Sequence, residues 1–355
     1  MPPLGGAAAK DPARRGGPVT LPRWAADRFE VEADPELLRR LISDMEQHGG
    51  DLKPAECWML PEQVACGPMS GLLDDWCGVI GQMPFVEQAA AGGEYAKRFR
   101  QAIEFAQAID HSGMLTGVPP STLAAAHWRV LDWNSLVDFS LITAFCPLPN
   151  QGARLLEIGG GFGRIPEFFS LAGYRNLKYV NVDAVPASLM YCHEYLRRRF
   201  PEKKVSVYLG QDRAAIADVD FLIVPAWRAA QALADDEFEL SINIESFQEM
   251  SQPLVDHYIA LLDRHTVKGG CVYMTNSRGY KFTGEYRFPA HWESVFRHRT
   301  LRAWTLDHPT EIFRKRGRPS PASHRVREYF YRQELQAAQC AIELAKRGEH
   351  NGRKG

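Results

Sequence analysis

Short apolar runs alternate with segments of helical periodicity from about residue 153 onward. Apolar runs bounded by glycine or polar residues are typical of strands buried on both faces, and apolar residues three and four apart are typical of the helices that cover them. We predict strands at 153–158, 178–183, 219–224, 238–243 and 270–275, with 205–209 as a further short candidate. We predict helices at 164–172, 186–200 and 252–264. This alternation indicates an α/β fold with a parallel sheet covered by helices on both faces.

The pattern before residue 150 is mostly helical. Asp34 and Pro35 open a helix whose apolar stripe runs to Met45, and Gly49-Gly50 ends it. Helical spacing also appears at 94–109 and 131–145, and a cluster of prolines, asparagine and glycine at 147–152 separates this region from the first strand.

The sequence therefore divides into four parts. We expect a disordered N-terminus at 1–20, a mostly helical N-terminal region at 21–150, a sheet domain at 151–310, and a basic C-terminal segment with a helix at 311–355. The sheet should close with an antiparallel pair, for which the apolar pieces around Val295 and Trp304 are the candidates.

Composition adds few constraints. The 355 residues are 45% hydrophobic, enough for a large core, and no run approaches the roughly 18 apolar residues of a membrane helix. The seven cysteines are scattered and show no zinc-site spacing, which favours reduced thiols and a cytoplasmic location. The net charge of -1 gives no general preference for nucleic acid, although residues 311–355 hold eleven Lys or Arg against five Glu.

A glycine-rich turn follows the first predicted strand. Glu157 ends the apolar run, and Gly159, Gly161 and Gly163 follow at alternate positions. Glycine accepts positive φ angles and leaves room for a ligand to approach the backbone, although a tight turn without a ligand would look similar. A dinucleotide fingerprint that starts at Gly159 would need a small residue where Arg164 stands, so a dinucleotide is the less favoured ligand.

The ends of the next two strands supply further candidates. Asp183 ends the second strand, where a carboxylate can accept both hydroxyls of a ribose; a plain strand-ending acid or helix cap is the alternative. Trp227 follows the third strand, where an adenine would stack, although a core tryptophan is an equally good interpretation. Asp212 would replace it on the adenine side if 205–209 were the third strand.

These motifs together resemble class I S-adenosylmethionine-dependent methyltransferases, and within them a family of sugar O-methyltransferases from bacterial polysaccharide and secondary-metabolite pathways. The resemblance covers roughly residues 130–285 and rests on four elements in order: Glu157 to Gly163, Asp183 with Pro186, Ser246-Phe247-Gln248-Glu249-Met250, and Asn276-Ser277-Arg278. Pro186 lies further from the acid than the family pattern has it, and residues 1–120 match no part of the family.

The resemblance implies a Rossmann-like class I methyltransferase sheet, S-adenosyl-L-methionine as cofactor, and a set of site residues. The expected cofactor-binding residues are Glu157, Gly159, Gly161, Gly163, Asp183, Trp227 and Asn243. The catalytic candidates are Glu249, Glu245 and His257, since a carboxylate with a raised pKa can take the proton of an alcohol. The acceptor-binding candidates are Asn276, Arg278 and Tyr280.

Plain alternatives exist for the catalytic and acceptor residues. Glu249 could be a helix N-terminal acid, His257 a surface residue of the next helix, and Asn276 to Tyr280 a solvated loop. We find no tight cluster of Asp, Glu or His at ligand spacing and expect no metal.

The predicted function is methyl transfer to a hydroxyl of a sugar or sugar-containing metabolite, without a membrane partner. A different small-molecule acceptor, or a non-catalytic methyltransferase-like binding protein, remains an alternative. Nucleic acid is a weaker one: the basic run from Arg314 to Arg318 favours it, but residues 243–246 lack the Asn-Pro-Pro-Tyr type of motif that holds a flipped base. The sequence does not predict the acceptor's identity or the oligomeric state.

Overall fold

A computed structural model of the chain describes residues 34–54, 130–276, 285–300 and 308–317. Four predictions lie outside these residues: the disordered N-terminus at 1–20, the helix at 94–109, the apolar piece around Trp304 and the helix expected in the C-terminal segment. Within the described ranges, no helix combines the length and the apolar character that crossing a bilayer requires.

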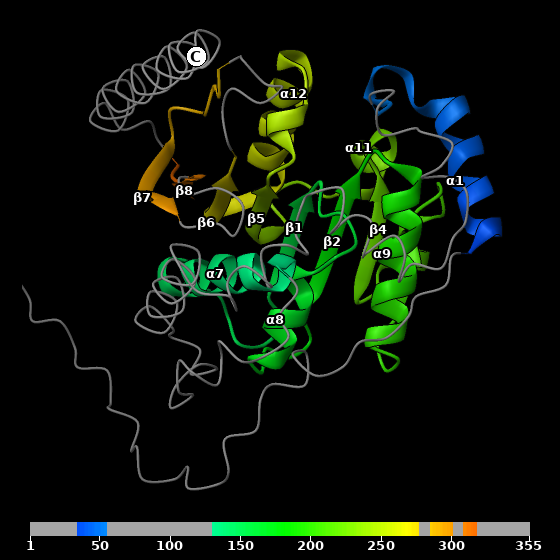
Figure 1. Cartoon of the computed structure of the whole chain (residues 1–355), viewed down its shortest axis with the longest axis horizontal. Helices are drawn as coiled ribbons and strands as arrows, with labels where there is room; N and C mark the ends of the chain where they lie inside the picture. The colour runs from blue at the N-terminus through cyan, green and yellow to red at the C-terminus, as the bar shows by residue number, and fades with distance from the viewer. Residues whose placement is uncertain (1–33, 55–129, 277–284, 301–307, 318–355) are drawn as a thin grey trace, which may run out of the picture.

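One eight-stranded sheet organises the described residues, in the order β3-β4-β2-β1-β5-β6-β8-β7 (Figure 1). Its parallel strands are β1 (Arg154–Ile158), β2 (Lys178–Asp183), β3 (Val205–Val207), β4 (Phe221–Pro225), β5 (Phe238–Ile244) and β6 (Thr266–Thr275). β7 (Trp292–Thr300) and β8 (His308–Lys315) are antiparallel to each other, and β8 is antiparallel to β6. β1, β2 and β4 are buried along nearly their whole length on both faces, as their apolar runs predicted.

The sheet confirms the predicted doubly wound, Rossmann-like α/β fold. From β1 the chain winds outward through β2 to β4 and then returns to the other side of β1 with β5 and β6. The order therefore reverses between β1 and β5, and in such sheets ligands bind beside the carboxyl ends of the strands at this switch point. Both 205–209 and 219–224 contain strands, but β4 is the one paired with β2, while β3 lies at the outer edge.

The antiparallel end of the sheet differs in detail from the prediction. β7 contains Val295, as expected, but the strand between β6 and β7 is β8, which the sequence analysis had assigned in part to the basic C-terminal segment. The predicted domain boundary at 310/311 falls inside β8, so the sheet extends at least to Lys315. β6 also begins earlier than predicted and runs through Gly269 and Gly270, where the ladder with β5 is irregular.

The longer described helices lie close to their predicted bounds. They are α1 (Pro35–His48), α7 (Val130–Phe145), α8 (Ile165–Leu171), α9 (Pro186–Arg199) and α12 (Gln252–His265). Short helical turns fill the connections: η3 (Gly50–Leu52), α10 (Arg213–Ile216), η5 (Ala226–Arg228), α11 (Ala229–Ala232) and η6 (Phe247–Glu249). Asp34 begins α1 as predicted, since its carboxylate accepts hydrogen bonds from the backbone N–H groups of Glu36 and Leu37.

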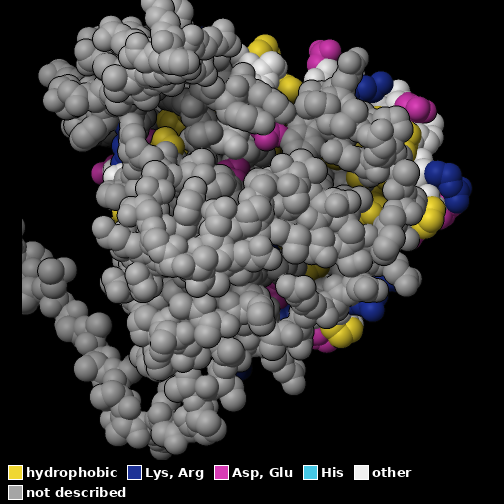
Figure 2. All heavy atoms as spheres, in the orientation of Figure 1, with side chains coloured by type: hydrophobic (Ala, Val, Ile, Leu, Met, Phe, Trp, Pro, Cys, Tyr) yellow, Lys and Arg dark blue, Asp and Glu magenta, His cyan; other side chains and the backbone are white. Residues whose placement is uncertain are grey.

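Two helices from the N-terminal region belong to the same core as the sheet. Phe139 of α7 packs edge-on against Phe169 of α8, with ring centroids 5.1 Å apart. α1 packs beside α9, and its outward residues include both acids and bases, namely Glu36, Arg39, Arg40 and Glu46. In Figure 2 the visible charged side chains of this part of the molecule are of both signs and form no single-sign patch.

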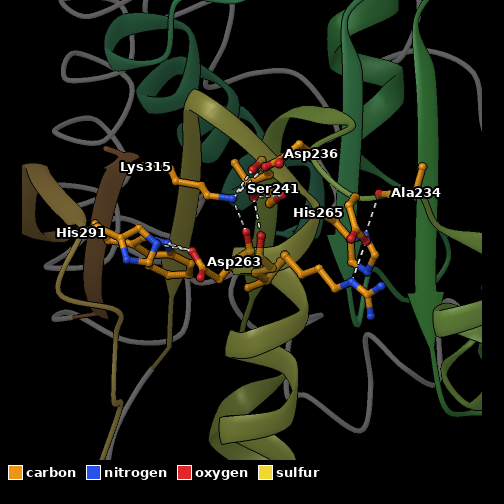
Figure 3. A network of polar contacts seen from close by, with 12 residues as sticks. Ala234, Asp236, Ser241, Asp263, His265, His291 and Lys315 are labelled. Atoms are coloured by element: carbon orange, nitrogen blue, oxygen red, sulfur yellow. Dashed lines mark hydrogen bonds and ion pairs between the residues drawn. The ribbon is translucent and has the colours of Figure 1, made fainter. Parts of the chain in front are cut away.

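Charged side chains at the amino edge of the sheet form a network of hydrogen bonds and ion pairs (Figure 3). The Lys315 ammonium at the end of β8 lies 2.9 Å from Oδ1 of Asp236 and donates to the backbone carbonyls of Asp263 and Thr266, at 2.5 and 2.7 Å. Asp263 in turn accepts hydrogen bonds from the His291 ring and the Trp292 indole, both at 2.7 Å. These contacts attach the β7–β8 hairpin to the C-terminal end of α12.

Candidate functional site at the carboxyl edge of the sheet

The glycine loop between β1 and α8 lies at the carboxyl edge, beside the switch point. Gly159 has φ +68° and Gly161 φ +55°, a region that side chains strongly disfavour. A Cβ on Gly159 would come within 2.4 Å of Ser246, in the loop after β5, whereas a Cβ on Gly161 would meet no atom of the described residues within 4 Å. Gly159 therefore lets two loops pack together, and Gly161 faces space that the described residues leave open to a ligand.

Glu157 lies under this loop, near the end of β1, and is only 2% exposed. Its Oε2 accepts a hydrogen bond from the Tyr179 hydroxyl of β2 at 2.5 Å. Burial raises the pKa of Glu157 to about 7; Asp138 and Asp183 add to this rise, while the Tyr179 hydrogen bond and the charge of Arg164 oppose it. The carboxyl group is thus half protonated near neutral pH.

Asp183 ends β2 and reaches the same loop. Its Oδ2 accepts from the backbone N–H of Gly161 at 3.3 Å, and its Oδ1 accepts from that of Val185 at 2.9 Å. Burial raises the pKa of Asp183 to about 6, although the backbone hydrogen bonds counteract part of the rise. Val185, and not Asp183, occupies the N-cap position of α9. The second strand therefore brings a carboxyl group against the glycine loop, as the spacing in the sequence suggested.

Buried amides join the ends of β1, β5 and β6. The Asn243 amide donates to the carbonyl of Ile158 at 2.9 Å and to the Ser246 hydroxyl at 2.5 Å. The Asn276 amide donates to Oδ1 of Asn243 at 2.8 Å, and its own oxygen accepts from the backbone N–H of Phe247 at 3.0 Å. Both side chains are engaged within the protein, where they fix the loop after β5; their predicted ligand roles stay predictions.

The loop after β5 carries the two acidic candidates. Glu245 has φ +57°, an uncommon conformation for a residue with a side chain, and its backbone N–H donates to the carbonyl of Thr275 at 2.8 Å. Glu249 lies in η6, and both side chains are half-buried. A positive φ such as that of Glu245 costs about 1–3 kcal/mol, and backbone strain of this kind is concentrated at functional sites. His257 lies further along the chain in α12, is exposed, and packs its ring edge-on against Tyr258.

Trp227 lies in η5, directly after β4, and connects this edge to α1. Its indole N–H donates to Oδ2 of Asp44 at 2.7 Å, and the Arg228 guanidinium binds both oxygens of the same carboxylate, at 2.5 and 3.1 Å. Burial by itself would raise the pKa of Asp44, but the hydrogen bonds from Arg228 and Trp227 outweigh it and lower the pKa. Only 8% of Trp227 is exposed, and its proposed adenine contact stays a prediction.

The remaining predicted residues are Arg278 and Tyr280, which lie outside the described residues. Asp212, the alternative on the adenine side, caps the short helix α10 through the backbone N–H of Ala214. Among the residues that the structure describes, no group of three or more His, Cys, Asp or Glu side chains is placed to hold a metal ion.

The sequence pattern did not single out two residues beneath the glycine loop. Tyr179 and Asn181 of β2 are both fully buried, and Gly160 packs against them. The available indication was the placement of two polar side chains in a strand that is otherwise apolar and buried on both faces. The contribution of Asp44 was also missed, because it depends on a contact 183 positions away in the sequence.

Comparison with known proteins gives low similarities. No protein-family model matches the chain, and no curated protein matches it. Among solved structures, the chain is similar to the YcgJ protein from Bacillus subtilis (14% identity, 39% of this chain and 50% of that chain, TM-score 0.29). It is similar to phosphoethanolamine N-methyltransferase 2 of Haemonchus contortus in complex with S-adenosyl-L-methionine (19% identity, 41% and 28%, TM-score 0.29).

A third similar structure is a SAM-dependent methyltransferase from Aquifex aeolicus (13% identity, 52% of this chain and 95% of that chain, TM-score 0.35). The chain thus spans half or less of the first two proteins. Similarities this low do not establish a function, so the chemistry of the site rests on its own residues.

Proposed function

We propose that the chain is an S-adenosylmethionine-dependent methyltransferase that transfers a methyl group to a hydroxyl of a sugar or sugar-containing metabolite. One observation carries the proposal: two buried carboxyl groups, Glu157 and Asp183, converge on the open glycine loop at the switch point of the sheet. A cationic nucleoside suits this arrangement, because a carboxylate can accept the two ribose hydroxyls and a second one can favour the ammonium group of the amino acid end.

The same observation disfavours a dinucleotide. A pyrophosphate needs backbone N–H groups and a positive environment at the start of the first helix. Here the N–H of Gly161 is bonded to Asp183, and the carboxyl group of Glu157 lies just beneath the loop. The negative charge of Glu157 beneath the loop would repel a pyrophosphate, whereas an acid in the position of Asp183 can bind a ribose in either class of ligand. The antiparallel closure of the sheet by β8 and β7 also agrees with what the methyltransferase resemblance implies.

The proposed roles follow from the chemistry of methyl transfer. The bound sulfonium supplies an already activated methyl group, so the protein has to align the acceptor and remove its proton. Glu249 and Glu245 follow β5 at the same edge and are the proposed bases, with His257 as a more distant candidate. Asn276, Arg278 and Tyr280, which follow β6, are the proposed contacts of the acceptor, and we propose that no metal is required.

Calorimetric titration of the full chain tests the cofactor. We expect S-adenosylhomocysteine to bind and NADH not to bind; tight binding of NADH without binding of S-adenosylhomocysteine would overturn the proposal. The Asp183→Asn variant should bind S-adenosylhomocysteine roughly tenfold or more weakly, because an amide accepts the ribose hydroxyls less well than a carboxylate. Asp218→Asn, a change at an exposed aspartate, is the matched control and should leave the affinity unchanged.

The acceptor is tested separately with cofactor that carries a labelled methyl group. We expect label on hydroxylated saccharides or glycosylated metabolites, released by glycosidic cleavage together with the sugar. Label that appears only on amines, or only on RNA or DNA, would refute the sugar-hydroxyl part and leave the methyltransferase part standing.

A further inference from the structure

Asn181 of β2 binds the backbone of the glycine loop with both ends of its amide. Its Oδ1 accepts from the N–H of Gly160 at 3.1 Å, and its Nδ2 donates to the carbonyl of Gly161 at 3.1 Å. The same Nδ2 lies 3.2 Å from the Cys192 sulfur of α9. The Asn181 side chain is fully buried. It bonds to the loop backbone as a neighbouring peptide group would, and so holds two successive loop residues.

Gly160 is the point where three polar groups converge. A Cβ built on it would lie 2.7 Å from Oδ1 of Asn181, 2.8 Å from the Tyr179 hydroxyl and 2.9 Å from Cδ of Glu157. The loop backbone thus rests directly on the Tyr179–Glu157 pair and on Asn181. The position of the loop and the position of the carboxyl group are set by the same side chains.

Tyr179 counteracts part of the effect of burial on Glu157, because its hydrogen bond favours the carboxylate. Burial raises the pKa of the Tyr179 hydroxyl well above its usual value, so it stays protonated and acts as a donor. Around the Glu157 carboxyl group lie Arg164 at the end of the loop, Asp138 of α7 and Asp183 of β2. Asp138 itself accepts a hydrogen bond from the Tyr273 hydroxyl of β6, at 2.5 Å. The groups around Glu157 therefore carry more negative than positive charge, so a cationic ligand would reduce the electrostatic repulsion on the Glu157 carboxylate.

We propose that Tyr179 and Asn181 are the positioning residues of the ligand loop: Asn181 fixes its backbone at residues 160 and 161, and Tyr179 holds the Glu157 carboxyl group beneath the loop, where its negative charge favours the ammonium group of the bound nucleoside. This inference rests on the proposed function. It adds a consequence, which is that ligand binding releases a proton from the protein when Glu157 starts out protonated.

The direction of the pH dependence follows from these contacts. A cation beside Glu157 favours its ionised form, so binding strengthens as the pH rises through about 7, where the carboxyl group loses its proton in the free protein. Tyr179→Phe removes a hydrogen bond that favours the carboxylate. The pH at which binding strengthens should therefore move upward, and the affinity at pH 7 should fall.

The experiment is calorimetric titration with S-adenosylhomocysteine between pH 6 and 9, in pairs of buffers with different ionisation enthalpies, which gives the number of protons released. We expect the wild-type chain to release about half a proton near pH 7, since that is close to the pKa of Glu157. Tyr179→Phe should release more than half a proton and should bind S-adenosylhomocysteine roughly three- to tenfold more weakly at that pH. Glu157→Gln should show a much smaller release, whatever its affinity.

Tyr195→Phe is the matched control. Tyr195 donates to the buried Glu167, so this variant loses the same kind of bond away from Glu157, and its proton release should equal that of the wild type. Asn181→Leu tests the other half of the proposal: we expect roughly tenfold weaker binding with an unchanged number of released protons, because the backbone groups of the loop lose their partners.

The outcomes separate the two proposals. If the wild-type chain does not bind S-adenosylhomocysteine at all, the proposed function fails. If it binds, but Tyr179→Phe and Glu157→Gln both keep the wild-type proton release and pH profile, the positioning inference is overturned. Circular dichroism of each variant shows whether it folds; if Tyr179→Phe does not, the comparison of Glu157→Gln with the wild type still decides.

Discussion

The two edges of this sheet are stabilised in different ways. At the amino edge, charged side chains pair with one another: Lys315 with Asp236, Arg154 with Glu239, and Arg264 with Asp235. At the carboxyl edge, the neutral amides of Asn181, Asn243 and Asn276 hold the loops. At the glycine loop, the buried carboxyl groups of Glu157 and Asp183 accept hydrogen bonds from neutral donors, whereas Asp44, further out on the same edge, pairs with Arg228.

This difference determines the charge that the proposed ligand would meet at the carboxyl edge. Glu157 accepts a hydrogen bond from a hydroxyl, and Asp183 accepts from backbone N–H groups. These bonds offset only part of the effect of burial, which raises the pKa of both carboxyl groups. An internal lysine such as Lys315 at that edge would have neutralised them. The amide scaffold instead fixes the loops without neutralising the carboxylates, which leaves their charge to favour a cationic ligand.

Glu249→Gln should give the largest effect on activity. If Glu249 is the base, the rate of methyl transfer falls by about 10²- to 10⁴-fold while S-adenosylhomocysteine still binds. Glu239→Gln, at the amino edge, is the control and should leave the rate nearly unchanged, since its partner Arg154 is partly exposed. Equal rates for Glu249→Gln and the wild type would exclude Glu249 and move the test to Glu245→Gln.

Gly159→Ala should give the largest loss of stability at the carboxyl edge. The new Cβ would meet Ser246 at 2.4 Å and occupy a backbone with φ +68°, so we expect a loss of roughly 2–5 kcal/mol in urea unfolding. Gly173→Ala separates the two causes, because Gly173 has φ +86° but none of the described atoms lies within 4 Å of its Cβ position. If both variants lose the same amount, close packing of the two loops contributes nothing.

The contribution of Glu157 to the stability of the ligand-free protein should fall as the pH rises from about 4 to 7. A carboxyl group whose pKa is raised on folding binds more protons in the folded state than in the unfolded state, so deprotonation favours unfolding. For Glu157, with a folded pKa of about 7 against 4.5, the contribution is roughly 3 kcal/mol over this range. Urea unfolding at several pH values measures it, and Glu157→Gln should flatten the slope; an unchanged slope would contradict the role of burial.

Lys315→Met should give the smallest of these effects. It leaves the carbonyls of Asp263 and Thr266 without this donor, which costs about 1–2 kcal/mol in unfolding free energy. Because the amino edge lies at the opposite end of the strands, the affinity for S-adenosylhomocysteine should not change. A large loss of affinity in this variant would show that the two edges are coupled.

The sequence was sufficient for the features that depend on local pattern. Buried strands, the glycine loop and Asp183 all lie within one strand–turn–helix unit or its neighbour, where periodicity and spacing are informative. The roles of Tyr179 and Asn181 could not be read, because a polar residue in a buried strand has a meaning only once its neighbours are known. β8 was missed for a similar reason: its run from His308 to Lys315 is rich in charge, and its place next to β6 is set by tertiary pairing.

The insertion of β8 between β6 and β7 imposes an order on how the sheet is completed. β7 comes first along the chain, yet within the described residues its strand partner is β8, so β7 reaches its native pairing only after β8 has been made. During synthesis the edge of β6 that β8 covers therefore stays open until residue 315 is made. An unpaired strand edge invites association with other chains, so this interval exposes the protein to misassembly.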